Sequence, residues 1–304
     1  MLLVPSLPAA AIVNGVPDDG EHPYVGQLLY YVPDAVDSRF DDPGGWFTCT
    51  GTLLDETTVL TAGHCVYGIG TDGEPTTLPD GALSSTGGTD VWINFLEAPD
   101  YSALPPSSTF VPDGNDERYD AWSAVLDADP DWRSATAYHH PEYDDGNFVL
   151  HDLGVLVLDE PAPDYATSDG FGVLPEVGLL DRLARVKGRT YEPVGYGLEE
   201  SGPLTASGGD TRRKATQKLV NLNGVFGYGK GTSAKFSNNQ GTNTTGGTCS
   251  GDSGGPVLAG DTSHVIVAVT SFGINPTCTG SDGAYRVDQA DDLAWLATFG
   301  VTAP

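Results

Sequence analysis

The sequence predicts an all-β protein built as a sandwich or barrel. Short runs rich in β-branched and aromatic residues recur along the chain, and clusters of Gly, Pro and Asp separate them. Glycine and proline are abundant, with 40 and 22 residues of 304, whereas only 18% of the residues are charged. Many short strands separated by turn residues are typical of β-sandwiches and barrels. The expected strands are residues 24–31, 57–61, 91–96, 154–158, 191–196, 265–272 and 283–287.

One helix is expected, at the C-terminus. Asp288 is placed to cap it, Leu293 and Leu296 have helical spacing, and Gly300 marks its end. Residues 70–133 are rich in Asp, Pro, Ser and Gly, and we interpret them as a long acidic surface insertion around the strand 91–96. Three further stretches are expected outside the strands: 199–210 and 233–247 as loops, and the basic cluster 212–214 as a solvated edge.

The charge of the chain excludes two classes of partner. The sequence has 42 Asp and Glu against 14 Lys and Arg, a net charge of −28 at pH 7. So negative a surface repels phosphate backbones, which excludes nucleic-acid binding. A basic amphipathic stretch is absent, so an anionic membrane face is not expected to bind the protein, and no apolar run is long enough to span a bilayer.

The cysteines and the first residues indicate the compartment. Cys49 and Cys65 are 16 residues apart, and Cys249 and Cys278 are 29 apart. No C-x-x-C pair occurs, which argues against a zinc ribbon or a thioredoxin-type site. The four cysteines fit two disulfides in an oxidising compartment or, alternatively, four buried thiols. Residues 1–11 are apolar and end in three alanines, so they are interpreted as a signal or pro-segment remnant.

A hexapeptide, Gly-Asp-Ser-Gly-Gly-Pro at 251–256, carries the strongest chemical signal. Nucleophilic acyl transfer needs a hydroxyl, a base, a carboxylate that orients the base, and N–H groups aimed at the oxyanion. Glycines beside Ser253 permit a tight turn that exposes its hydroxyl. Of the six histidines, only His64 follows an apolar run in a small-residue, cysteine-flanked context, Thr-Ala-Gly-His-Cys at 61–65.

These two motifs together resemble the trypsin/chymotrypsin family of serine proteases. Ile-Val-Asn-Gly at 12–15, Cys-Thr-Gly-Thr-Leu-Leu at 49–54, Gly-Tyr-Gly at 195–197 and Ser-Phe-Gly at 271–273 extend the resemblance over residues 12–304. It implies one peptidase domain, folded as two six-stranded antiparallel Greek-key barrels with a C-terminal helix and a cleft between them. It also implies the disulfides Cys49–Cys65 and Cys249–Cys278.

The resemblance assigns a role to each candidate site residue. Ser253 would be the nucleophile and His64 the general base, and Asp152, in a His-Asp-Leu-Gly run, would orient the base ahead of its competitors Asp145 and Asp159. The N–H groups of Gly251 and Ser253 would form the oxyanion hole, and Ser271 would support Asp152. Asp252 would pair with the ammonium of Ile12 once cleavage after the three alanines frees it, with no separate zymogen step.

The expected specificity pocket leaves two interpretations open. Its residues would be Gly247, Thr248, Ser271, Phe272, Gly273, Asp282 and Gly283. Gly247 at the floor and the glycines in the walls make an open, uncharged pocket for a bulky apolar side chain. The segment from Cys278 to Tyr285 is about one residue shorter than usual in the family, however, so Asp282 could reach the pocket and favour Lys or Arg.

The sequence thus predicts a monomeric secreted or periplasmic serine endopeptidase that acts on proteins or peptides and meets proteinaceous inhibitors. The alternatives are a catalytically silent homologue that serves as a binding module, and an esterase that uses the same triad. No cofactor and no metal are expected. Calcium binding by Asp72, Glu74 or Asp80 is disfavoured without a calcium loop. Asn243 begins a glycosylation sequon that matters only in a eukaryotic secretory route.

Overall fold

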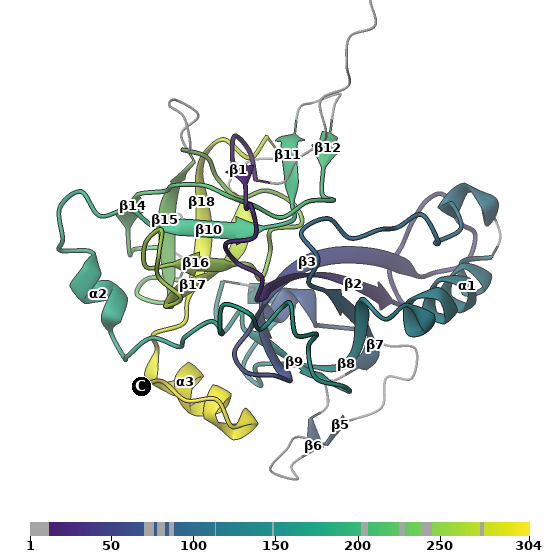
Figure 1. Ribbon diagram of the computed structural model, residues 1–304, viewed down its shortest axis with the longest axis horizontal. Coiled ribbons are helices and arrows are strands. Elements are labelled where there is room, and N and C mark those ends of the chain that lie inside the picture. Colours follow the sequence, from purple (N-terminus) through teal and green to yellow (C-terminus); the bar gives the residue numbers. More distant parts are fainter. Residues whose placement is uncertain are drawn as a thin grey trace, which may run out of the picture.

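The computed structural model describes residues 12–69, 76–77, 83–84, 88–112, 114–147, 149–201, 206–224, 229–238, 245–273 and 277–304. The expected signal or pro-segment 1–11, the acidic residues Asp72, Glu74 and Asp80, and Asn243 of the sequon lie outside these ranges. The described chain is mostly β, with two large sheets and few helices (Figure 1). The all-β expectation is therefore confirmed.

The first sheet is a closed antiparallel barrel of six strands in the order β2-β3-β4-β9-β8-β7. Its interior is filled by alternate aliphatic side chains such as Leu28, Val59, Ile93 and Leu156, all fully buried. Burial of apolar side chains on one face of every strand is what closes such a barrel. The strands are β2 (Val25–Val32), β3 (Gly45–Leu53), β4 (Thr58–Thr61), β7 (Gly88–Asn94), β8 (Trp132–His139) and β9 (Gly154–Leu158).

The second sheet has eight strands in the order β1-β13-β10-β16-β17-β18-β15-β14, rather than the six of a closed barrel that the resemblance implies. Short edge strands at both ends account for the larger number. Its strands are β1 (Val16–Pro17), β10 (Glu192–Gly195), β13 (Arg213–Lys214), β14 (Leu219–Asn221), β15 (Ser233–Asn238), β16 (Pro256–Leu258), β17 (Ile266–Gly273) and β18 (Gly280–Arg286). Two separate hairpins pair β5 (Thr76–Thr77) with β6 (Leu83–Ser84) and β11 (Leu198–Ser201) with β12 (Ala206–Gly208).

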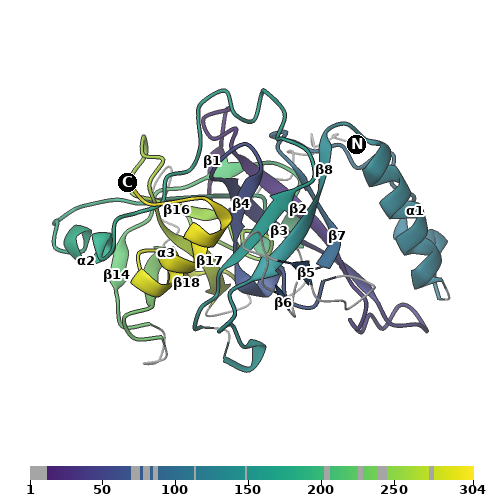
Figure 2. The same cartoon turned by 90° about the horizontal axis from the view of Figure 1, so that it is seen from below.

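The expected C-terminal helix is present as α3 (Ala290–Leu296), followed by the 3₁₀ turn η4 (Ala297–Phe299) and ended by Gly300 at φ 87°. Asp288 does not cap it. Its carboxylate instead accepts hydrogen bonds from the N–H of Leu180 at the start of α2 (Leu179–Leu183) and from the nearby guanidinium of Arg286. Figures 1 and 2 show α3 on the opposite side of the molecule from α1 (Asn115–Ala128). No helix in the described part of the chain has the length and apolarity needed to cross a bilayer.

The acidic insertion is shorter than the predicted 70–133 and holds a helix that the sequence did not predict. Strand β7 and the first residues of β8 fall inside that range but belong to the barrel, and Asn94 lies opposite Trp132 where the two strands pair. Between them runs α1 (Asn115–Ala128), on the side of the barrel away from the eight-stranded sheet (Figures 1 and 2). The aromatic rings of Tyr119 and Trp122 pack on Trp46 of β3 at 6.1 and 5.2 Å between centroids, which fastens α1 to the barrel.

Arg212 is buried rather than solvated, so the interpretation of residues 212–214 as a solvated edge is wrong for it. Its Nε lies 2.8 Å from Asp18 Oδ2, and its Nη1 donates to the carbonyls of Val25 and Phe95. Burial alone would raise the pKa of Asp18, but hydrogen bonding from His22 and the charge of Arg212 outweigh it and lower that pKa to about 2. The bonds of Arg212 to the carbonyls of Val25 and Phe95 tie the second sheet to the barrel.

Candidate active site

His64 and Asp152 lie together at the edge of the barrel. His64 sits in the 3₁₀ turn η1 (Gly63–Cys65) just after β4, and Asp152 precedes β9, which pairs with β4. The Nδ1 atom of His64 is 3.0 Å from Asp152 Oδ2, and the backbone N–H of His64 donates to Asp152 Oδ1 at 2.9 Å. Asp152 is fully buried, whereas the His64 side chain is a quarter exposed. The Asp152 carboxylate therefore orients the His64 ring so that Nε2 points away from the carboxylate.

Ser271 completes the surroundings of this carboxylate. Its hydroxyl, on β17 of the second sheet, donates to Asp152 Oδ2 in a short hydrogen bond. The competing acidic residue Asp159 lies after β9 and accepts a hydrogen bond from Ser134 instead. The competitor Asp145 lies in the 3₁₀ turn η3 (Asp145–Asn147). Asp152 is thus the residue that the fold brings to His64.

Ser253 lies on a tight loop before β16 that is fastened to β3 by Thr50. The N–H of Thr50 donates to the carbonyl of Ser253 at 2.8 Å, and its Oγ1 donates to the carbonyl of Gly251 at 2.9 Å. Gly251 and Gly254 both adopt positive φ, and a Cβ on Gly254 would collide with Thr61 Oγ1. The glycines of the hexapeptide are therefore required by backbone conformation and by close packing. The positioning role of Thr50 was missed because nothing local in the sequence marks it.

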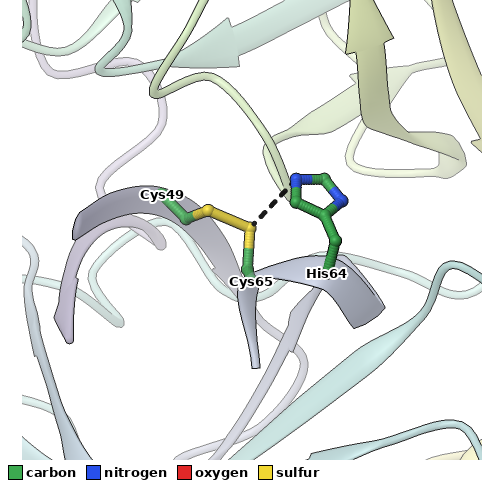
Figure 3. A group of neighbouring side chains, drawn as sticks. All are labelled: Cys49, His64 and Cys65. Atoms are coloured by element: carbon green, nitrogen blue, oxygen red, sulfur yellow. Dashed lines mark hydrogen bonds between the residues drawn. A yellow bond between two sulfur atoms is a disulfide. The ribbon is translucent and has the colours of Figure 1, made fainter. Parts of the chain in front are cut away.

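Both expected disulfides, Cys49–Cys65 and Cys249–Cys278, are present. The first lies beside His64, whose Nε2 is 3.7 Å from Cys65 Sγ (Figure 3). The three ligand atoms of Cys49, His64 and Cys65 are close enough to hold a metal ion. Because both sulfurs are in the disulfide bond, they have no thiolate to offer a metal.

Ile12 and Asp252 are both fully buried in the second half of the molecule. Val13, the residue after Ile12, forms an antiparallel bridge with Gly247, two positions before Cys249. The carboxylate of Asp252 accepts the N–H groups of Gly197 at 2.7 Å and Cys249 at 2.8 Å. No cationic side chain of the described chain is paired with it. Burial, only partly offset by these N–H groups, raises the pKa of Asp252 to about 7.

The residues expected in the specificity pocket gather along β17, β18 and the adjoining 247–248 segment. Phe272 lies opposite Gly283, and a Cβ on Gly283 would overlap the Phe272 ring. Gly273 lies opposite Asp282 in the same pairing. The Oδ2 atom of Asp282 accepts hydrogen bonds from Thr248 N, Thr248 Oγ1 and Gln217 Nε2 at 2.7–2.8 Å. Burial raises the pKa of Asp282 despite these donors.

A second polar cluster lies directly behind Asp152. The rings of His140 and His151 stack at 4.6 Å, and Asp292 Oδ1 of α3 lies 3.6 Å from His140 Nε2 and 3.2 Å from His151 Nδ1. Tyr285 donates its hydroxyl to Asp292 Oδ2 at 2.8 Å. Burial raises the pKa of Asp292 to about 6 and lowers that of His140 to about 4. The cluster ties α3 to the residue that precedes Asp152, and no sequence motif marks it.

A groove begins at Ser253 and His64 and encloses about 950 Å³. It passes Gly251, Cys49 and Phe47 and reaches Arg118 of α1. The site therefore joins a serine and a histidine held by a buried carboxylate, and both side chains line one groove.

Comparisons with known proteins agree with this geometry. The sequence model of the trypsin family matches residues 17–90 and 124–294, leaving out the segment that contains the start of α1. A solved structure described as HL collagenase is similar over 94% of this chain and 97% of its own, with a TM-score of 0.60 and 16% sequence identity. That identity supports the fold alone. A search of curated proteins finds no match. Since the family model spans most of the sequence, including both halves of the site, the chain belongs to the trypsin family of serine proteases.

Proposed function

We propose that this protein is a serine endopeptidase that hydrolyses peptide bonds through an acyl-enzyme intermediate. The observation that carries the proposal is the hydrogen-bonded pair of His64 and the buried Asp152, at the head of the groove that Ser253 also lines. A carboxylate on Nδ1 fixes the tautomer in which Nε2 can accept a proton, which is the state a general base requires.

The reaction assigns one role to each residue. The Ser253 hydroxyl attacks the scissile carbonyl carbon while His64 Nε2 takes its proton, and the N–H groups of Gly251 and Ser253 hold the oxyanion. His64 then gives that proton to the leaving amine as the carbonyl reforms. In the second half, His64 takes a proton from water, the resulting hydroxide attacks the acyl carbon, and Ser253 leaves with the proton returned by His64. Asp152 stays ionised and, with Ser271, keeps the imidazolium oriented.

For the residue on the acyl side of the scissile bond we propose a preference for bulky apolar side chains. Support comes from the three hydrogen bonds that Thr248 and Gln217 donate to Asp282 Oδ2, so that this carboxylate is already committed within the protein. The alternative, a preference for Lys or Arg, requires Asp282 to be charged and turned toward substrate. Matched Phe and Arg peptides decide between the two, and Asp282→Ala should abolish Arg cleavage only in the second case.

We also propose that the enzyme is secreted or periplasmic and becomes active when cleavage before Ile12 frees its amino group. The two disulfides fit an oxidising compartment. Burial of Ile12 and the lack of a cationic side chain on Asp252 in the described chain leave that carboxylate in need of a counter-charge. N-terminal sequencing of the active form tests this, and a fully active form with another first residue contradicts it.

Labelling with a serine-directed organophosphonate tests the function itself. We expect one label per chain, mapped by mass spectrometry to Ser253, and none on Ser253→Ala. Absence of labelling would support a silent homologue instead. Digestion of casein by protein that accepts the label, blocked once the label is attached, separates a peptidase from an esterase, because an esterase would hydrolyse activated esters and leave casein intact.

A further inference from the structure

The groove beyond Ser253 lies on one side of the scissile bond. It is lined by Cys49, Ser250 and Gly251 near the nucleophile, and by none of the seven residues assigned to the specificity pocket. Those seven would receive the side chain on the acyl side. A substrate bound for hydrolysis therefore places its leaving-group side in this groove, a statement that rests on the proposed function.

The far end of the groove is basic and aromatic, although the protein as a whole is strongly acidic. Arg39, Trp46, Arg118 and Trp122 line that end. Asp210 supplies the carboxylate in the described lining. It follows β12 and does not belong to α1. Two cationic side chains thus gather at one place in a protein whose net charge is −28.

Arg118 is a buried cation without a carboxylate partner in the described chain. Its residue is 2% exposed, and its guanidinium carbon lies 4.5 Å from the ring centre of Phe40 and 5.4 Å from that of Trp122. Its Nε is buried without a hydrogen-bond acceptor, and no described carboxylate forms an ion pair with it. Buried arginines are almost always paired. Burial lowers the pKa of Arg118, yet a guanidinium stays charged at neutral pH.

The nearest carboxylates are committed elsewhere. Asp37 binds Arg39 through both oxygens, with Nε at 2.9 Å from Oδ1 and Nη2 at 2.5 Å from Oδ2. Asp42 accepts the N–H groups of Asn115 and Asp116 at the start of α1. Neither one neutralises Arg118 by direct contact.

Trp46 supplies a second buried hydrogen-bond donor without an acceptor in the described chain. Its Nε1 is buried and has no hydrogen-bond acceptor in the described chain, and its ring lies 5.2 Å from that of Trp122. Two buried donors without acceptors, one on β3 and one on α1, therefore line the same end of the groove. Both need a hydrogen-bond acceptor, and the charge of Arg118 favours an anionic one.

The wall that carries these donors is rigid. Trp122 Nε1 donates to the carbonyl of Pro105 at 2.9 Å, and the Tyr119 hydroxyl donates to Asp90 Oδ1 of β7 at 2.6 Å. Trp92 Nε1 donates to Asp127 Oδ1 at 2.8 Å, near the other end of α1. Donors fixed in this way lose little freedom when a ligand binds.

We propose that this end of the groove binds a carboxylate on the leaving-group side of the peptide substrate. Arg118 provides the charge and Trp46 a hydrogen bond, whereas Arg39 at the same end is already bound to Asp37. An Asp or Glu side chain and the C-terminal carboxylate of a short peptide have the same chemistry, and both are candidates for this position.

Three series of quenched peptides with Phe before the scissile bond test the proposal. The first carries Glu, and the second Gln, at each of the first four leaving-group positions in turn, both with an amidated end. The third has no acidic side chain and ends in a free carboxylate at each position. For the wild type we expect a ratio of kcat/KM between Glu and Gln of about tenfold to a hundredfold at one position. A matching gain in the third series alone would identify the chain terminus as the ligand.

The ratio within each variant is the readout, so a partly unfolded preparation does not distort it. In Arg118→Met the ratio should fall to about one while cleavage of the Gln peptides persists. Trp46→Phe, which keeps an aromatic ring and removes the donor, should reduce it. Arg182→Gln, an exposed arginine on α2, is the matched control and should leave it unchanged.

Two outcomes separate this proposal from the proposed function. Cleavage of all peptides with no preference for a carboxylate at any position, or a preference that survives in Arg118→Met, would overturn the carboxylate site and leave the endopeptidase intact. No cleavage of any peptide, together with no labelling of Ser253, would overturn both.

Discussion

The Thr50 hydroxyl donates a hydrogen bond to the carbonyl of Gly251 at 2.9 Å, and the Thr50 N–H donates one to the carbonyl of Ser253 at 2.8 Å. One residue of the first barrel thereby fixes both ends of the short loop whose N–H groups are assigned to the oxyanion hole. The hydroxyl also accepts the N–H of Tyr196 at 3.2 Å, so it joins three segments far apart in the sequence.

Replacement of Thr50 by Val keeps the shape of the side chain and removes the hydrogen bonds of its hydroxyl. We expect kcat to fall about tenfold with KM little changed, since the loop would hold the transition state less well than the substrate. Steady-state kinetics on a Phe peptide measure this. Thr50→Ser retains the hydroxyl and should recover most of the activity; an equal loss in both variants would show that the effect is packing alone.

Asp152→Asn should reduce kcat about 10⁴-fold at neutral pH, because an amide no longer stabilises the imidazolium or the required tautomer. Ser271→Ala should cost far less, since Asp152 would keep both of its bonds to His64. The kcat/KM of each variant between pH 5 and pH 9 is the measurement. A loss in Ser271→Ala as large as in Asp152→Asn would contradict the assignment of roles.

The stability of the uncleaved chain should depend on Asp252. Its pKa is raised in the folded state to about 7, so the folded chain binds a proton that the unfolded chain releases near pH 3.8. This contribution is fully present below pH 4 and is lost as the pH rises to about 7. Thermal unfolding across that window should show the loss in the uncleaved chain and not in Asp252→Asn. In the form that begins at Ile12, the ammonium should reverse the trend.

Asp18 should have the opposite effect on stability. Its folded-state pKa of about 2 lies below the ordinary 3.8, so its contribution is present above pH 4 and is lost as the pH falls toward 2. Arg212→Met removes the cation from Asp18 Oδ2 while His22 stays hydrogen-bonded to Oδ1, and should cost about 1.5–3 kcal/mol of unfolding free energy. Urea unfolding at pH 7 checks this value. The double variant Asp18→Asn, Arg212→Met should recover part of the loss in unfolding free energy. If its loss equals the sum of the two single losses, the two residues are not directly coupled.

Asp292→Ala should lower both Tm and kcat, because it releases His151, the neighbour of Asp152, from α3. Asp292→Asn, which can still accept the Tyr285 hydroxyl, should retain more of each. Melting curves and kcat measured on the same preparations separate the two effects. If Tm falls while kcat per active site is unchanged, the cluster contributes to stability and not to the position of Asp152.

The sequence could predict those motifs whose structural requirement is met by residues next to one another in the chain. Gly251 and Gly254 need positive φ at their own positions, and His64 lies next to its disulfide, so short motifs sufficed. Helix α1 could not be predicted in this way. Its first N–H groups are capped by Asp42, and its ring contacts are made with β3, both distant in sequence. Arg212 was misinterpreted for the same reason, since its partner Asp18 lies 194 positions away.

The direct pairing of β7 with β8 places the two ends of the α1 segment side by side, with Asn94 opposite Trp132. That segment is in effect an enlarged hairpin loop, which can lengthen or shorten without shifting the register of the barrel. The walls assigned to the acyl side belong instead to β17 and β18 of the other sheet. Evolution can therefore adjust the preference for residues after the scissile bond without disturbing the preference for the residue before it.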